Sequence, residues 1–157
     1  MCECECVHER GRFCLKLIWS NEIPQETCLG TVGITRQEFN TSFSMIETNL
    51  TDIKTKEYLE CVWKKHNIID SEGNVDQAQY NDFFAKFIGL CHNWDSKTTQ
   101  NNKIILMPVF SKLAKIKQFQ LWDPISILNK IKLYLFVLSS TGTKAQVDPF
   151  EAFMKVQ

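Results

Sequence analysis

Apolar and aromatic positions recur at intervals of three and four residues along much of the chain. The clearest stretch carries Tyr80, Phe83, Phe84 and Phe87. Residues at this spacing lie on one face of an α-helix, so the stretch predicts an amphipathic helix with a buried aromatic face. Three further stripes have the same spacing: Phe39, Phe43 and Ile46; Tyr58, Leu59, Val62 and Trp63; and Ile125, Leu128, Ile131, Leu135 and Leu138. The pattern predicts an all-α fold.

Three short segments carry the same signal for the start of a helix. In each, a residue that can cap a helix follows a β-branched residue, and Glu or Gln stands three places after the cap. The cap accepts a hydrogen bond from a free backbone N–H while the later side chain reaches back to the cap. The three pairs are Thr35 and Glu38, Asp76 and Gln79, and Asp148 and Glu151. We expect a helix to begin after each cap.

Val75 sets the register of a predicted calcium loop. An EF-hand loop has twelve residues, with oxygen ligands at positions 1, 3, 5, 7, 9 and 12 and a glycine at position 6. When Val75 is the β-branched residue at position 8, the loop spans residues 68–79 and Gly73 falls at position 6. The candidate metal ligands are then Asp70, Glu72, Asn74, Asp76 and Gln79.

Ile34 sets the register of a second predicted loop, which spans residues 27–38 and ends at Glu38. Glu38 is therefore a further candidate metal ligand. Because paired EF-hand loops meet at their position-8 residues, we expect Ile34 and Val75 to form a short two-stranded contact. The sequence therefore predicts two EF-hand-like helix–loop–helix units in the first part of the chain.

Two segments resemble a known family closely enough to name it. GITRQEFNTSF at 33–43 is similar to the second half of a first EF-hand, and YLECVWKKHNIIDSEGNVDQAQYNDFFAKF at 58–87 resembles the second hand of sarcoplasmic calcium-binding proteins and calexcitins. MPVFSKLA at 107–114 resembles the entering helix of a third EF-hand, and LSSTGTKAQVDPFEAFMKV at 138–156 resembles a degenerate fourth EF-hand. The resemblance implies a cytosolic, all-helical, non-enzymatic calcium buffer or signalling module.

The ligand sets are incomplete, which predicts weakened calcium sites. Calcium takes six or more oxygen ligands and usually a bidentate Glu at position 12. Ile68 at position 1 offers no side-chain oxygen, and Gln79 offers a neutral amide at position 12. In the first loop the only carboxylate among the ligand positions is Glu38. The second pair of hands is more degenerate still.

Charge and cysteine content narrow the other possibilities. The 157 residues carry 18 basic and 18 acidic side chains, so the net charge does not favour a nucleic-acid-binding protein. The seven cysteines are an odd number and are crowded at the start of the chain, which is not typical of a disulfide framework. Residues 1–12 do not resemble a signal peptide, and no stretch is long and apolar enough to cross a membrane. We expect a cytoplasmic protein, and no motif indicates an enzyme.

Two alternatives to calcium binding follow from the sequence. The first is a metal-independent interaction module on the EF-hand scaffold, which would bind a protein partner or, through the lysine-rich segment 103–132, a membrane surface. The second is a thiol-metal protein that uses Cys2, Cys4, Cys6 and Cys14. The expected organisation is a mobile thiol-rich segment at 1–20, an EF-hand-like pair at 21–92 and a degenerate helical half at 93–157.

Overall fold

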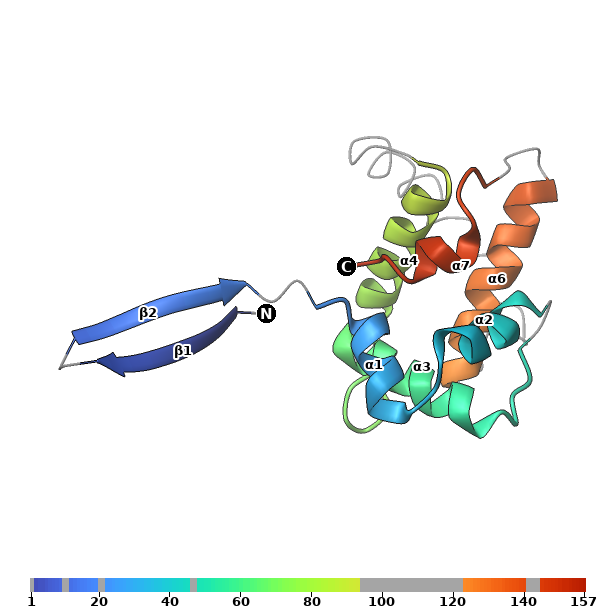
Figure 1. The fold of residues 1–157 in the computed structure, drawn as a ribbon. Coiled ribbons are helices and arrows are strands. Elements are labelled where there is room, and N and C mark those ends of the chain that lie inside the picture. The colour runs from blue at the N-terminus through green and yellow to red at the C-terminus, as the bar shows by residue number, and fades with distance from the viewer. Residues whose placement is uncertain (1, 10–11, 20–21, 46–47, 94–122, 141–144) are drawn as a thin grey trace.

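The computed structural model describes residues 2–9, 12–19, 22–45, 48–93, 123–140 and 145–157. From residue 22 onwards, the regular elements in these ranges are helices, which confirms the predicted helical class for this part of the chain. They are α1 (Pro24–Val32), α2 (Arg36–Ser44), α3 (Ile53–Lys65), α4 (Gln77–Cys91), α6 (Pro124–Ser140) and α7 (Pro149–Phe153). α1 and α6 pack against α3, and α7 packs against α4 and α2 (Figure 1).

The first residues form a β-hairpin rather than a helix. β1 (Cys2–Glu9) and β2 (Arg12–Trp19) are antiparallel, with Cys2 opposite Trp19 and Glu9 opposite Arg12. The alternation of cysteine and glutamate in CECEC has the period of two that is typical of a strand. In Figure 1 the hairpin extends away from the helices. The division of the chain at residues 20 and 92 stays a prediction.

The three predicted helix starts are confirmed. At α2 the capping box is complete, because the Glu38 backbone N–H donates to Thr35 Oγ1 at 3.1 Å and the Thr35 N–H donates to Glu38 Oε2 at 3.0 Å. At α4 the Asp76 carboxylate accepts from the Gln79 N–H at 3.2 Å. α7 begins at Pro149, directly after Asp148, although the Asp148 side chain makes no cap hydrogen bond there. The caps of α2 and α4 therefore start these two helices independently of any calcium loop.

The predicted loop 27–38 is wrong, because most of it is helical. α1 runs to Val32 and α2 begins at Arg36, so only three residues join the two helices. Gly33 has φ 77°, a left-handed conformation that glycine adopts without steric cost, and the N–H groups of Gly33 and Ile34 donate to Leu29 O at 2.9 and 3.1 Å. These bonds end α1 and turn the chain directly into α2.

The predicted contact between Ile34 and Val75 is also wrong. Val75 pairs with Ile69 in an isolated antiparallel bridge within its own turn. Ile34 is buried between α1 and α2. EF-hand pairing is therefore not supported, and the proposed interaction module on that scaffold loses its basis. In the C-terminal half, the helix predicted from the stripe between Ile125 and Leu138 is confirmed, since α6 runs without a break from Pro124 to Ser140.

Candidate functional site

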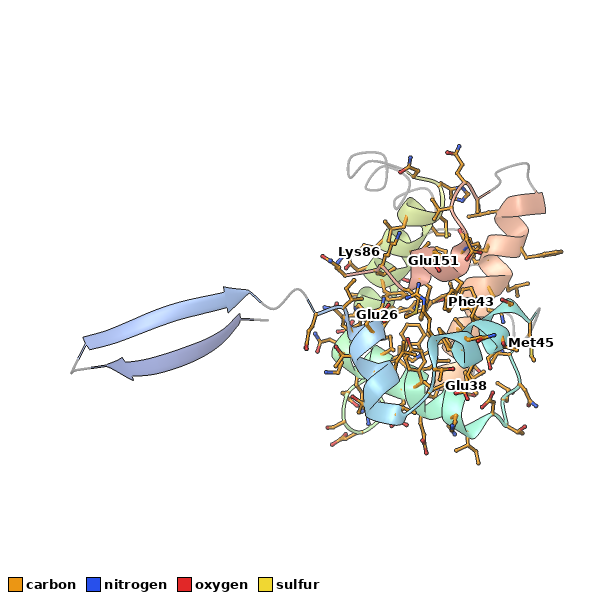
Figure 2. The ribbon with its side chains drawn as sticks, viewed as in Figure 1. Glu26, Glu38, Phe43, Met45, Lys86 and Glu151 are labelled. Carbon is orange, nitrogen blue, oxygen red and sulfur yellow. A yellow bond between two sulfur atoms is a disulfide. The ribbon has the colours of Figure 1, made fainter. Side chains whose placement is uncertain are left out.

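A cluster of aromatic side chains lies between the helices. Its members come from α2, α3, α4 and α7 and are buried: Phe39, Phe43, Tyr58, Trp63, Phe83, Phe87, Phe150 and Phe153. We call this set the aromatic cluster. Side chains crowd this interior in Figure 2, where Phe43 is labelled. The helical stripes in the sequence predicted six of the eight members and missed the two on α7.

Phe153 lies at the centre of the aromatic cluster. Its ring centroid is 5.5 Å from that of Phe39, 5.9 Å from that of Trp63 and 5.8 Å from that of Phe83. The contacts with Trp63 and Phe83 are edge-to-face, which is a favourable geometry for aromatic rings. Because Phe153 is the last residue of α7, this short helix closes one side of the interior.

The side-chain amide of Gln25 hydrogen-bonds α7 and the residues after it to α1. Gln25 of α1 is fully buried, and its Nε2 donates to Phe153 O at 2.7 Å and to Val156 O at 2.9 Å. Its backbone carbonyl accepts from the Tyr58 hydroxyl at 2.9 Å. These bonds satisfy polar groups that would otherwise weaken the apolar interior. The sequence offered no signal that would have singled out Gln25.

His66 completes the polar group around Gln25. Its Nε2 lies 2.8 Å from Gln25 Oε1, and because an amide oxygen only accepts, Nε2 carries the hydrogen. The ring also packs edge-on against Phe83, with centroids 4.8 Å apart. Burial, together with the nearby positive charge of Lys86, lowers the pKa of His66 to about 4. The imidazole is therefore neutral at neutral pH.

Charged side chains cover the outer edge of α7. Arg36 binds both Glu26 of α1 and Glu151 of α7, the latter at 2.7 Å, and its guanidinium lies 5.3 Å from the Phe150 ring centroid. The two carboxylates are labelled in Figure 2. The hydrogen bond from Arg36 to Glu151 and the attraction of both carboxylates raise the arginine pKa. This exposed network orients α7 but contributes little stability.

A disulfide joins α1 to α3, contrary to the expectation from the cysteine count. Cys28 and Cys61 are bonded, with their Cα atoms 5.9 Å apart. Cys91 is reduced and buried, and burial with the nearby Asp148 raises its thiol pKa to about 12. The side chains of the cysteines at positions 2, 4, 6 and 14 lie outside the described residues, so the thiol-metal alternative stays a prediction.

The predicted ligands at Asp70, Glu72 and Asn74 lie in a self-contained turn. Asp70 Oδ1 accepts from the backbone N–H groups of Glu72 and Asn74, at 2.9 and 2.8 Å, and its Oδ2 accepts from Asn74 Nδ2 at 3.1 Å. These hydrogen bonds, led by the one from the Asn74 backbone, lower the pKa of Asp70. The carboxylate therefore stabilises the turn that contains Gly73.

Of the other predicted ligands, Asp76 and Glu38 cap helices, and Gln79 takes part through its backbone N–H. Asp76 accepts from the Gln79 N–H at the start of α4, and Glu38 belongs to the capping box of α2. Among the residues that the structure describes, no group of three or more His, Cys, Asp or Glu side chains could hold a metal ion. The arrangement therefore offers no support for a bound calcium ion.

The described part of the lysine-rich segment does not form an open basic face. Lys130 is only 5% exposed, and Lys132 Nζ donates to Thr48 Oγ1 at 2.8 Å while lying 5.9 Å from the Phe43 ring centroid. Residues 103–122 lie outside the described ranges. Among the helices of the described ranges, none has the length and apolar character needed to cross a membrane.

One family model matches the chain. It is the model of the PBP/GOBP family, the insect odorant- and pheromone-binding proteins, and it matches residues 22–105. The match includes both predicted calcium loops, so the resemblance to sarcoplasmic calcium-binding proteins and calexcitins is wrong. The predicted calcium cofactor and the buffer or sensor function are wrong with it.

The family also changes the expected location of the protein. Proteins of this family are typically secreted, so the predicted cytoplasmic location is wrong. The Cys28–Cys61 disulfide agrees with an oxidising compartment. Comparisons with curated proteins and with solved structures found no match. Because the family model matches more than half of its residues, the chain belongs to the PBP/GOBP family.

Proposed function

We propose that the protein binds a small apolar molecule in the interior that the aromatic cluster lines. Members of the family are binding and carrier proteins, and the family suggests small hydrophobic ligands. The observation that carries the proposal is the aromatic cluster itself, which brings eight buried rings from four helices together in a chain of this family. The protein is then a carrier that leaves its ligand chemically unchanged.

The polar groups at the edge of the interior support the same ligand class. The Gln25 amide, the Tyr58 hydroxyl and His66 Nε2 are engaged with each other or with backbone carbonyls. A ligand therefore meets mainly carbon surface. Each methylene that it buries stabilises the complex by about 0.8 kcal/mol, which is roughly a fourfold gain in affinity per carbon until the interior is filled.

Displacement of the fluorescent probe N-phenyl-1-naphthylamine by straight-chain alcohols of six to twelve carbons tests the proposal. We expect affinity to rise with chain length by roughly fourfold per methylene and then to level off. Millimolar calcium is expected to leave both binding and thermal unfolding unchanged. Failure of every alcohol to displace the probe, with no saturable heat in calorimetry, would overturn the proposal.

A matched pair of variants locates the site. Phe153→Leu removes the central ring of the aromatic cluster, whereas Phe136→Leu makes the same exchange at a position on α6 that is 70% exposed. Loss of aromatic contacts worth about 1 kcal/mol weakens binding roughly fivefold in the first variant. We expect no change in the second. Equal effects of the two substitutions would place the ligand outside the aromatic cluster.

A further inference from the structure

The connection between α2 and α3 carries the sequence Asn49-Leu50-Thr51. An asparagine followed two positions later by threonine or serine, with any residue except proline between them, is the acceptor signal for N-linked glycosylation. The signal can be used only in the secretory pathway, where the oligosaccharide is attached. Proteins of the PBP/GOBP family are typically secreted, and the Cys28–Cys61 disulfide agrees with that route. The family therefore gives the signal at Asn49 a chemical meaning.

Asn49 and Thr51 are exposed, and their side chains contact each other in the turn before α3. The backbone N–H and the hydroxyl of Thr51 both donate to Asn49 Oδ1, at 3.0 and 2.8 Å. These bonds use the amide oxygen, and no atom of the described residues accepts a hydrogen bond from Asn49 Nδ2. The nitrogen that would carry a sugar is therefore unengaged. Because the contact spans only two positions, it can form before the rest of the chain has folded.

The backbone on either side of Asn49 is held without its side-chain nitrogen. Thr48 is buried; its N–H donates to Asn129 Oδ1 at 2.9 Å, and its carbonyl accepts from Asn129 Nδ2 at 3.2 Å. On the other side, the Asp52 N–H donates to Asn49 O at 3.1 Å. A group attached to Nδ2 replaces one amide hydrogen at the surface, so it leaves all of these bonds intact.

The chain holds a second match to the same signal, Asn40-Thr41-Ser42 on α2. Ser42 is only 8% exposed, and its hydroxyl donates to Asp52 Oδ2 at 3.2 Å and accepts from Thr55 Oγ1 at 3.1 Å. An acceptor asparagine is expected in a surface loop rather than in a helix with a buried hydroxyl partner. Asn40 therefore provides a comparison within the same chain.

Exposed apolar side chains flank the signal at Asn49. Among the described residues, Met45, Leu50 and Ile53 are 49%, 46% and 71% exposed, and all three lie within four positions of Asn49. Met45 is labelled in Figure 2. Contiguous apolar surface promotes association between protein molecules, whereas an attached glycan is bulky and increases solubility. An oligosaccharide on Asn49 is therefore placed to cover this surface.

We propose that Asn49 is an N-glycosylation site whose oligosaccharide covers the apolar side chains next to it. Asn49 Nδ2 bonds to the anomeric carbon of an oligosaccharide that is carried on a polyprenyl diphosphate. The bond from that carbon to the diphosphate oxygen breaks, the diphosphate leaves with the electron pair, and the nitrogen loses one proton to a base of the transferase. Nothing is oxidised or reduced. The site is independent of the proposed ligand binding.

The experiment directs the full chain into the secretory pathway of cultured insect cells with an added cleavable signal peptide. Trypsin cuts after Arg36 and Lys54, so both signals fall in one peptide, residues 37–54. Peptide N-glycosidase A in heavy-oxygen water then converts each glycosylated asparagine to labelled aspartate, which tandem mass spectrometry locates. We expect the label at Asn49 and an unmodified asparagine at Asn40. Absence of the label at Asn49, in secreted and in cell-retained chains alike, overturns the proposal.

Three substitutions complete the design. Thr51→Ala is expected to abolish the glycan although Asn49 remains, Thr51→Ser to keep it, and Asn40→Gln, the matched control, to leave it unchanged. Chains retained in the cells are mapped as well, so a variant that folds poorly still gives a result. By light scattering, we expect Thr51→Ala to associate at a several-fold lower protein concentration than the glycosylated wild type. Equal association of the two proteins overturns the covering role of the glycan.

Discussion

Removing the Cys28–Cys61 disulfide provides the most direct test of how the helices are held together. The bond closes a segment of 33 residues between α1 and α3. Cross-linking positions this far apart removes unfolded-state entropy worth about 3.7 kcal/mol at 25 °C. Domains of this kind are stabilised by about 5–15 kcal/mol in total, so the loss is a large fraction of the free energy of unfolding.

The assay is urea unfolding followed by far-UV circular dichroism. For the double variant Cys28→Ala/Cys61→Ala, a urea dependence of about 2 kcal/mol per molar gives a midpoint lower by roughly 2 M. Reductant is expected to lower the wild-type midpoint by the same amount and to leave the double variant unchanged. Cys91→Ala is the matched control, because it empties a buried thiol site without removing a cross-link and costs about 1 kcal/mol.

Two results would refute this reasoning. One is a wild-type midpoint that does not respond to reductant. The other is a double variant that is as stable as Cys91→Ala. Either result would mean that α1 is held on α3 by packing and by the Gln25 hydrogen bonds alone, or that Cys28 and Cys61 are not bonded in solution.

Three further predictions concern polar groups around the core. The pKa of His66 is about 4 in the folded protein and near 6.5 in the unfolded chain, so the unfolded state binds more protons between these two pH values. The contribution of His66 to the free energy of unfolding is therefore fully present above pH 6.5, and the free energy of unfolding falls by about 1–3 kcal/mol toward pH 4. Urea midpoints across this range are expected to vary less in His66→Gln, and identical slopes would contradict the assignment. Gln25→Leu leaves the carbonyls of Phe153 and Val156 without their donor and should lower the free energy of unfolding by about 2–4 kcal/mol. Amide hydrogen exchange is expected to become faster around Phe153 and Val156, and an unchanged exchange rate would contradict the prediction. Asp52→Ala removes the N-cap of α3, where the Asp52 carboxylate accepts from a backbone N–H at 3.2 Å. The substitution should lower the free energy of unfolding by about 1 kcal/mol in thermal denaturation. An unchanged melting temperature would argue against this cap.

Local signals in the sequence predicted local structure correctly. The Thr35–Glu38 pair and Asp76 start helices where the capping pattern placed them, and the aromatic stripes point into the core. The error came from interpreting the same signals as calcium loops. An extended β-branched residue followed by a cap precedes many helices, so Ile34 and Val75 fitted position 8 of an EF-hand without being partners. Gly33, placed after a helical segment that begins with Pro24, was the overlooked signal for the end of α1.

The long-range contacts were beyond sequence reasoning. Cys28 and Cys61 meet only because α1 packs on α3, and the pairing of several cysteines cannot be deduced from their spacing. The bond from Gln25 to Phe153 spans 128 positions, and neither residue carries a motif that indicates the other. The aromatic cluster was therefore predictable helix by helix, but its closure by α7 was not.

The large sequence separation of the Gln25 hydrogen bonds affects how the chain folds during its synthesis. The two acceptors of the Gln25 amide lie 128 and 131 positions downstream, so the first helix acquires these partners only after the chain has been translated as far as Val156. Until then the rings of α2, α3 and α4 lack the Phe150 and Phe153 side chains that complete their packing. Nascent chains of this protein therefore expose apolar surface of an incomplete core to the cell's folding machinery until α7 has been translated.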